Sequence, residues 1–429
     1  MRGFKLIVVF ALLVVSTACF GEVNSALIGF WGGSIKALDI EIEVFVNLTE
    51  QDGTMKGVIS VPEQMQFDDP IVDLAVKKND ISFKVDLQIP AYFKGTLKGN
   101  KIEGKFTQGG ATGTFSLTKQ QQRELRPIEM LMEPLKGETN VSVKTNFGNL
   151  YGSLVIPEKK DKMPLVIIVP GSGPTDRDGN NTLIYGKGFV YRQIAEKLSE
   201  NGIASLRYDK RGIGASADAL IKEEDLRIGY LVQDVSTWIT KYKSDERFSS
   251  IIILGHSEGS LIGMLACQKT KVNGFISLAG PGRNMGDIVI DQLSMQDESI
   301  KKESREIVRS LKQGKTYPNV SDALAPVFRK EIQPYLVSIM KYDPVMELRT
   351  LDIPILILQG TSDLQISVKD AELLASASNK AELKIIEGMN HMMRTTSKDL
   401  GENFKSYGDP DQPLTADFVK ELIRFLKKF

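Results

Sequence analysis

The residues best suited to chemistry are gathered in one short segment, Gly255-His256-Ser257-Glu258-Gly259. Apolar residues precede and follow it, so the serine is expected in a sharp turn between a buried strand and a buried helix. Side chains at the two glycine positions would collide across such a turn. The turn pushes the serine hydroxyl clear of the backbone, and the start of the next helix favours negative charge beside it. We predict that Ser257 is a nucleophile; an ordinary serine in a strand-to-helix turn is the alternative.

A serine nucleophile needs a base that takes its proton. The chain has only two histidines, His256 and His391. His256 is next to the serine, and neighbouring side chains in such a turn point in different directions, so we expect the base to be His391. It stands in the segment EGMNHMMR, directly after the last apolar strand. If His391 were only a capping or surface histidine, Ser257 would have no imidazole at all.

The histidine in turn needs a carboxylate that fixes its tautomer and stabilises its cation. Asp363 lies in the segment GTSDLQIS, directly after the next-to-last apolar strand. Asp352 precedes that strand and Asp370 belongs to the helix that follows, so both are badly placed. We therefore predict Asp363 as the acid, with a loop-capping aspartate as the alternative.

A tetrahedral intermediate at Ser257 needs backbone N–H groups that stabilise its oxyanion. One donor is expected to be Glu258, the residue after the nucleophile. The other should come from the loop after the first parallel strand, VIIVPGSGP, where glycines let the backbone approach a substrate. We assign it to the N–H of Ser172, with that of Gly173 as the alternative.

Charged side chains follow two of the predicted strands, in the segments PTDRDGN and RYDKRG. We interpret them as a salt-bridge network that joins two loops. The alternative is that Glu258 pairs with one of the arginines, Arg177 or Arg211, beside the nucleophile and shapes the choice of substrate.

From Met163 onward, continuous apolar strands alternate with helical segments. This pattern predicts a mostly parallel sheet with helices on both faces. Residues 283–351 interrupt the alternation, since they contain charged, helical, methionine-bearing sequence and no strand-like run. We interpret this insertion as a helical lid over the site; a pair of packing helices is the alternative.

Residues 26–119 have a different pattern, with short alternating strands separated by Gly, Asn and Asp turns. It predicts an antiparallel β-sandwich or barrel. The segment contains neither His nor Cys, so we expect a docking or shielding module. Residues 120–140 are interpreted as a linker, and residues 141–429 as the domain that carries the chemistry.

Residues 1–25 have the pattern of a secretory signal peptide. Arg2 and Lys5 precede an apolar core that is too short to span a bilayer comfortably. Residues 16–18 fit a cleavage site, and lipidation of Cys19 as a membrane anchor is the alternative. The mature chain is therefore expected to be exported, as a periplasmic, extracellular or membrane-anchored protein, without a transmembrane segment.

The composition argues against several other classes of function. The chain has 54 basic and 54 acidic residues, a formal net charge of zero, and no basic block, so a nucleic-acid partner is not expected. Two histidines, and cysteines without a C-x-x-C pattern, argue against a metal site. No cofactor is expected.

Taken together, the segments GHSEG, PGSGPTDRDGN, RYDKRGIGAS, GTSDLQIS and GMNH resemble those of the EstD-type carboxylesterases. These are secreted serine hydrolases with the α/β-hydrolase fold and a β-rich N-terminal domain. The resemblance implies hydrolysis of short-chain acyl esters by Ser257, Asp363 and His391, in the chain order typical of that fold, with a small-molecule ester as substrate and no metal. Two alternatives remain: a serine aminopeptidase or acyltransferase on the same scaffold, and a non-catalytic surface protein that binds lipid or glycan.

Overall fold

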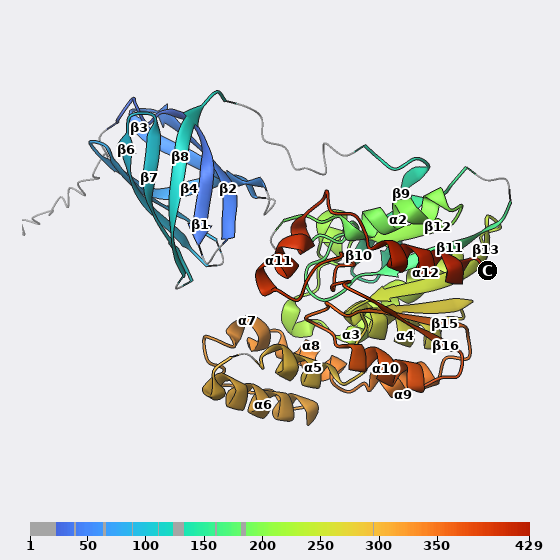
Figure 1. Cartoon of the computed structure of the whole chain (residues 1–429). Coiled ribbons are helices and arrows are strands. Elements are labelled where there is room, and N and C mark those ends of the chain that lie inside the picture. Colours follow the sequence, from blue (N-terminus) through green and yellow to red (C-terminus); the bar gives the residue numbers. More distant parts are fainter. Residues whose placement is uncertain are drawn as a thin grey trace, which may run out of the picture. The chain divides into compact units, whose positions relative to one another are not determined.

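The computed structural model describes residues 23–429 except 38–39, 63–65, 88, 110, 123–132, 159–160, 182–185 and 295. Most of the predicted signal segment, including Cys19, lies outside the described residues. The chain divides after residue 132 into two compact units, and each is described by itself (Figure 1). Within the described ranges, no helix has the length and apolar character needed to cross a membrane.

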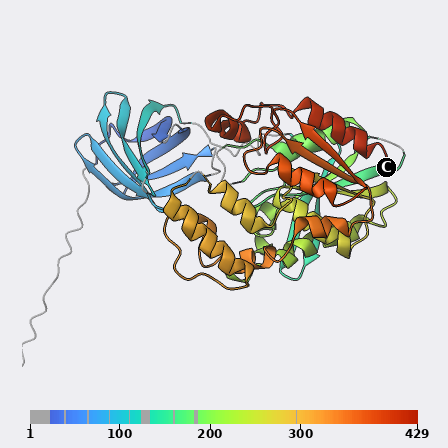
Figure 2. The ribbon, with the colours of Figure 1, turned by 60° about the horizontal axis from the view of Figure 1, so that its bottom comes forward.

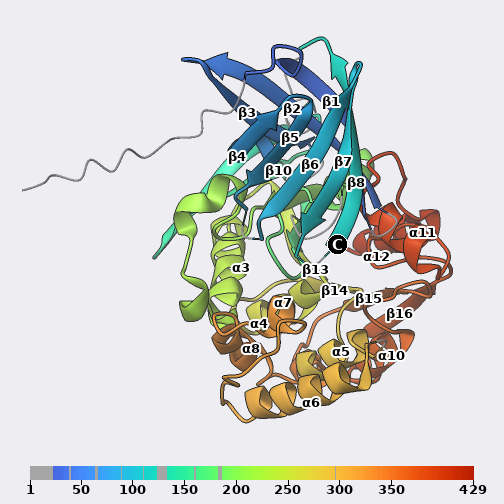
Figure 3. The same ribbon diagram turned by 90° about the vertical axis from the view of Figure 1, so that its left-hand side faces the viewer.

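The first unit is a closed barrel of eight antiparallel strands (Figure 3). Each strand pairs with the next along the chain, and the first pairs with the last. Of the two predicted architectures, sandwich and barrel, the structure has the barrel. The strands are β1 (Gly29–Ala37), β2 (Ile40–Gln51), β3 (Thr54–Val61), β4 (Gln66–Lys77), β5 (Asp80–Val85), β6 (Ala91–Lys98), β7 (Lys101–Gln108) and β8 (Ala111–Gln120).

Alternation of side chains along each strand fills the barrel interior, because successive residues point to opposite faces. In β6, Ala91, Phe93 and Leu97 are buried, whereas Tyr92 and Lys94 between them are exposed. The ring of Phe93 packs on other buried phenylalanines of the interior at centroid distances of 4.7–5.4 Å. The barrel therefore has its own apolar core.

The second unit contains a mixed sheet of eight strands in the order β16-β15-β14-β13-β11-β12-β10-β9. The hairpin β9–β10 and the β10–β12 pair are antiparallel, and all other pairs are parallel. The strands are β9 (Glu138–Thr145), β10 (Gly148–Val155), β11 (Met163–Val169), β12 (Ala204–Tyr208), β13 (Phe248–His256), β14 (Gly274–Leu278), β15 (Ile355–Gly360) and β16 (Ala381–Ile386).

Helices cover both faces of this sheet, which confirms the predicted architecture. Successive residues of β11 enter different cores: Val166 and Ile168 pack with α2 and α12, while Leu165 and Ile167 pack with α3 and α4. The helices outside the insertion are α2 (Val190–Glu200), α3 (Ile228–Tyr242), α4 (Glu258–Lys269), α10 (Val368–Ser376), α11 (Leu400–Lys405) and α12 (Ala416–Leu426), with 3₁₀ turns at Gly214–Ala219, Glu223–Asp225 and Ser406–Gly408.

All the regular elements described in the insertion between β14 and β15 are helices, as the sequence predicts (Figure 2). Within this insertion, α5 packs on α6 and α6 on α8, while α8 also contacts α3 of the main unit. The helices are α5 (Met285–Gln292), α6 (Glu298–Lys312), α7 (Ala325–Phe328), α8 (Gln333–Ile339) and α9 (Pro344–Arg349).

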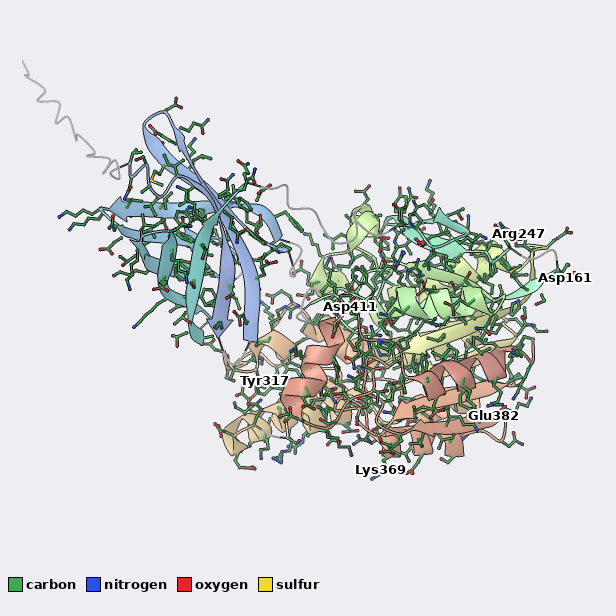
Figure 4. All side chains as sticks on the ribbon, turned by 45° about the horizontal axis from the view of Figure 1, so that its top comes forward. Asp161, Arg247, Tyr317, Lys369, Glu382 and Asp411 are labelled. Atoms are coloured by element: carbon green, nitrogen blue, oxygen red, sulfur yellow. The ribbon has the colours of Figure 1, made fainter. Side chains whose placement is uncertain are left out.

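The two ends of the parallel strands are distinct surfaces of the second unit. In Figure 4, the labelled side chains of Asp161, Arg247 and Glu382 lie on one side, close to the starts of β11, β13 and β16. Asp411 lies towards the opposite side. Because parallel strands all end at one edge of the sheet, the loops after them meet there. Ligand sites of parallel sheets lie at this edge, outside the carboxyl ends of the strands.

Candidate active site

The segment around Ser257 forms the sharp turn that the sequence predicts. Strand β13 ends at His256, α4 begins at Glu258, and Ser257 between them has φ 54° and ψ −125°. A non-glycine residue at positive φ is uncommon and strained. Ser257 is half-buried, whereas the residues on both sides of it are buried. The turn therefore leaves the serine as the accessible residue of an otherwise buried segment.

Both glycines of the turn are required by close backbone contacts. A Cβ atom at Gly255 would lie 2.3 Å from the carbonyl oxygen of Gly259. A Cβ atom at Gly259 would lie 2.3 Å from the carbonyl oxygen of Val169. Real Cβ atoms do not approach backbone so closely, so the structure confirms the predicted collision across the turn for Gly255, whereas Gly259 is required by the neighbouring end of β11.

His391 and Asp363 come together at the ends of two neighbouring strands. Nδ1 of His391 lies 2.8 Å from Oδ2 of Asp363. Asp363 is held in place because Oδ1 accepts hydrogen bonds from the backbone N–H groups of Gln365 and Ile366. Burial acts to raise the pKa of Asp363, but His391 and these hydrogen bonds together outweigh it, and the pKa is lowered. The carboxylate is therefore ionised and can stabilise an imidazolium.

The other ring nitrogen of His391, Nε2, has no hydrogen-bond partner within the described part of the chain. The hydroxyl of Ser257 likewise makes no hydrogen bond there, and none joins it to His391. His391 is nevertheless adjacent to the turn, because the ring of His256 lies 4.8 Å from the ring of His391. A hydrogen bond between a nucleophile and its base often tightens only when the substrate is bound. The structure thus places the three predicted residues in one neighbourhood and pairs two of them directly.

His256 is a buried neutral histidine, as expected of a residue that is not the base. Its Nε2 lies 2.9 Å from the carbonyl oxygen of His391, which only accepts, so Nε2 carries the proton. Its Nδ1 lies 2.8 Å from the hydroxyl of Tyr191 and accepts from it. Burial, followed by the proximity of His391, lowers the pKa of His256 to about 3.

The two predicted oxyanion donors come from segments that meet at the serine. Glu258 is the first residue of α4, so its N–H has no partner within the helix. Ser172 follows Gly171, where a Cβ atom would lie 3.3 Å from Cβ of Ser257. The carbonyl of Ser172 accepts hydrogen bonds from Thr175 and from another loop side chain, whereas its N–H makes none within the described chain.

The charged loop residues form the predicted network. Arg177 makes a bidentate contact with Asp209, which joins the loop after β11 to the loop after β12. Arg211 pairs with Asp234 of α3, with Nη2 2.5 Å from Oδ1. The hypothesis that Glu258 pairs with one of these arginines is wrong, because each arginine already has a carboxylate partner.

The side chain of Glu258 instead lies between a lysine and the insertion. Its carboxylate is 3.6 Å from Nζ of Lys210, and both residues are buried. Tyr335 of α8 also lies near this carboxylate, and its pKa is raised well above its ordinary value by burial and then by the charge of Glu258. A side chain of α8 therefore lies close to the residue that follows the nucleophile. Sequence reasoning missed Lys210 and Tyr191, although Lys210 stands in the conspicuous segment RYDKRG.

No cluster of three or more His, Cys, Asp or Glu side chains suitable for a metal ion occurs among the residues described. The site consists of side chains that can move protons and hold an acyl group.

The eight-stranded mixed sheet, the helices on both faces and the serine at the strand-to-helix turn are the features of the α/β-hydrolase fold. A family model described as serine aminopeptidase, S33, matches residues 187–316. The resemblance to EstD-type proteins is also found: the chain is 28% identical over 251 residues to Esterase EstD of Thermotoga maritima, across 57% of this chain and 58% of that protein. The match therefore spans less than two thirds of the relative's length.

Solved structures with similar folds include Est1E of Butyrivibrio proteoclasticus with ferulic acid bound and the α/β hydrolase GrgF of Penicillium sp. sh18. Est1E is 17% identical with a TM-score of 0.46, and the match covers 67% of this chain and 97% of Est1E. GrgF is 20% identical with a TM-score of 0.45, and the match covers 68% of this chain and 98% of GrgF.

Proposed function

We propose that the protein is a serine carboxylesterase that hydrolyses short-chain acyl esters through Ser257, His391 and Asp363. The observation that carries this proposal is the pairing of His391 Nδ1 with Asp363, which leaves Nε2 without a partner in the described part of the chain, close to the half-buried Ser257. A histidine with one nitrogen fixed by a carboxylate and the other available is the arrangement that a serine nucleophile needs. The similarity to an esterase over 57% of the chain supports the same reaction.

In this mechanism, Nε2 of His391 takes the proton from Ser257 Oγ as the oxygen attacks the ester carbonyl. The N–H groups of Glu258 and Ser172 stabilise the oxyanion of the tetrahedral intermediate. The imidazolium, stabilised by Asp363, then gives its proton to the leaving alcohol, and an acyl-enzyme remains on Ser257. Water activated by the same histidine releases the acid and restores the serine.

The proposal is tested with p-nitrophenyl esters of increasing acyl length and with a fluorophosphonate probe. We expect the highest kcat/KM for the short chains, and labelling of Ser257. Ser257→Ala should abolish labelling and nearly all turnover without changing the melting temperature. The matched control is Ser249→Ala, which removes an exposed hydroxyl near the start of β13. Unchanged turnover in Ser257→Ala would contradict the mechanism, and failure of the probe would favour a non-catalytic binding protein.

A second candidate is a serine aminopeptidase, because the matching family model carries that description. An aminopeptidase needs a carboxylate that binds the substrate amine, and Glu258 is the acid nearest to the nucleophile. However, Glu258 is buried and already faces Lys210 at 3.6 Å, which favours esters. Aminoacyl anilides assayed beside short esters distinguish the two candidates, and an alcohol acceptor in the ester assay reveals acyl transfer.

We also propose that the protein is exported and that its first residues serve as a signal peptide. The support is the basic and apolar pattern of residues 1–25. Mass spectrometry of the mature protein from its native membrane and soluble fractions tests this. A new N-terminus near Cys19 supports cleavage, and a diacylglycerol adduct on Cys19 supports lipid anchoring.

A further inference from the structure

The N–H of Gly171 is held by a chain of hydrogen bonds that leads to the candidate base. Gly171 N donates to the hydroxyl of Tyr191 at 3.1 Å, and that hydroxyl donates to Nδ1 of His256 at 2.8 Å. His256 continues the chain by donating from Nε2 to the carbonyl oxygen of His391 at 2.9 Å. All four residues are buried. The residue before the nucleophile thus links the loop after β11 to the loop that carries His391.

The carbonyl of Gly171 is held by a second group of residues. Nζ of Lys210 donates to this oxygen at 2.8 Å. Lys210 is only 9% exposed, and a buried ammonium needs an opposite charge nearby. Glu258 supplies that charge at 3.6 Å. The residue after the nucleophile therefore supports the other side of the same glycine.

The geometry points to Tyr191 and Lys210 as positioning residues that fix the backbone of Gly171, and with it the N–H of Ser172, beside Ser257. His256 holds Tyr191 in place, and Glu258 holds Lys210. This inference rests on the proposed function, in which the N–H of Ser172 stabilises the oxyanion. The carbonyl of Gly171 and the N–H of Ser172 belong to one planar trans peptide, so they point in opposite directions. A lysine that holds the carbonyl on one side therefore aims the N–H to the other.

Gly171 needs such support because of its own residue type. A side chain at this position would be crowded by the turn, since a Cβ atom would lie 3.3 Å from Cβ of Ser257 and 3.4 Å from Nδ1 of His256. Glycine satisfies this but leaves the backbone free to rotate. Two anchors, one on the N–H and one on the carbonyl, remove that freedom. An oxyanion donor is effective when it is already in place before the reaction.

Two variants test the inference by removing one anchor each. Tyr191→Phe removes the acceptor for the N–H of Gly171, and Lys210→Met removes the donor to its carbonyl. We expect each to lower kcat about tenfold with KM changed less than about twofold, because loss of a complete oxyanion donor costs about 10²–10³-fold. Affinity for a trifluoromethyl ketone, which forms a tetrahedral adduct, should fall by the same factor, and the pH midpoint of kcat should not move.

Hydrogen exchange measured by mass spectrometry supplies a readout that does not depend on turnover. Peptides that contain residues 171–173 should exchange faster in both variants than in the wild type. The matched control is Tyr242→Phe, since the hydroxyl of Tyr242 is buried without a hydrogen-bond partner, at the far end of the sheet beside Phe248. Tyr191→Phe removes one oxygen atom only, so it carries the test if Lys210→Met does not fold.

The outcomes separate this inference from the proposed function. Faster exchange together with a loss of kcat in an active esterase supports it. Unchanged exchange and unchanged kcat in an active esterase overturn it, as does a loss of kcat that equals the loss of affinity for a ground-state inhibitor. A wild-type protein that hydrolyses no ester contradicts the proposed function, whereas the exchange rates still decide whether Gly171 is anchored.

Discussion

Nδ1 of His391 lies 2.8 Å from Oδ2 of Asp363, although 28 residues separate them in the chain. The contact depends on the parallel pairing of β15 with β16, which brings the loops after the two strands to the same edge of the sheet.

Asp363→Asn would keep the shape of the side chain while removing its charge. We expect kcat to fall about 10³–10⁴-fold with the fold intact, because the histidine loses both its preferred tautomer and its counter-charge. The control is Asp352→Asn, since Asp352 is exposed and lies before β15; equal losses in both variants would contradict the role of Asp363.

Gly259→Ala tests the steric basis of the turn. The new methyl group would meet the carbonyl oxygens of Val169 and Pro170 at 2.3 and 2.5 Å, neither of which can move without shifting β11. We expect a loss of about 3 kcal/mol or more in the free energy of unfolding. Gly229→Ala is the matched control, because a Cβ atom there meets nothing within 4 Å and α3 should gain up to about 1 kcal/mol. Urea unfolding measures both, and a tolerated Gly259→Ala would refute the explanation.

The pH dependence of stability should report the burial of His256. Its pKa is about 3 in the folded protein, against 6.5 for the ordinary side chain. As the pH falls from 6.5 towards 3, the unfolded chain takes up a proton that the folded chain does not, so the folded state loses stability. In His256→Asn this loss is absent. We expect the variant to be less stable than the wild type at pH 8, with the gap narrowing by up to about 1.4 kcal/mol per pH unit towards pH 4. Parallel stability curves would show that His256 is not buried in the neutral form.

Arg211 is predicted to matter for stability and not for substrate choice. Its guanidinium pairs with Asp234 in a buried site. Burial raises the pKa of Asp234 to about 6, although the contact with Arg211 lowers it. Arg211→Ala would leave a buried carboxylate without its partner, at a cost of about 3–5 kcal/mol. The acyl-chain preference of the esterase should stay unchanged. Arg247→Ala serves as the control, since Arg247 is exposed (Figure 4) and its pairing is worth about 1 kcal/mol or less. An altered chain-length profile in Arg211→Ala would contradict the structural role.

Parts of the site follow from local sequence alone. The two glycines around Ser257 are readable because the reason for them lies within the turn and in the strand beside it. His391 was identified because the chain offers only one histidine besides the one next to Ser257. The parallel sheet was predictable as well, since its strands are buried on both faces and form continuous apolar runs.

Other features depend on contacts between distant segments. Closure of the barrel requires β1 to pair with β8, and alternation within single strands does not distinguish a barrel from a sandwich. The alternative that Glu258 pairs with an arginine fails because adjacent residues of an irregular loop point in different directions. Lys210 therefore faces Glu258, while Arg211 turns to α3. Tyr191 carries no signal in its own segment, because its hydroxyl acquires a role only through the position of α2.

Pairing of β1 with β8 has a further consequence for the behaviour of the N-terminal unit. Every open sheet has two outermost strands whose unpaired N–H and C=O groups can recruit a strand from another molecule. The barrel has no such strand, whereas the sheet of the second unit ends in β9 and β16. β16 bears Glu382 and Lys384 among its six residues, and charged side chains on an outer strand discourage association. Because only the second unit has outermost strands, intermolecular β-pairing, and any fibril that grows from it, should begin there despite these charges.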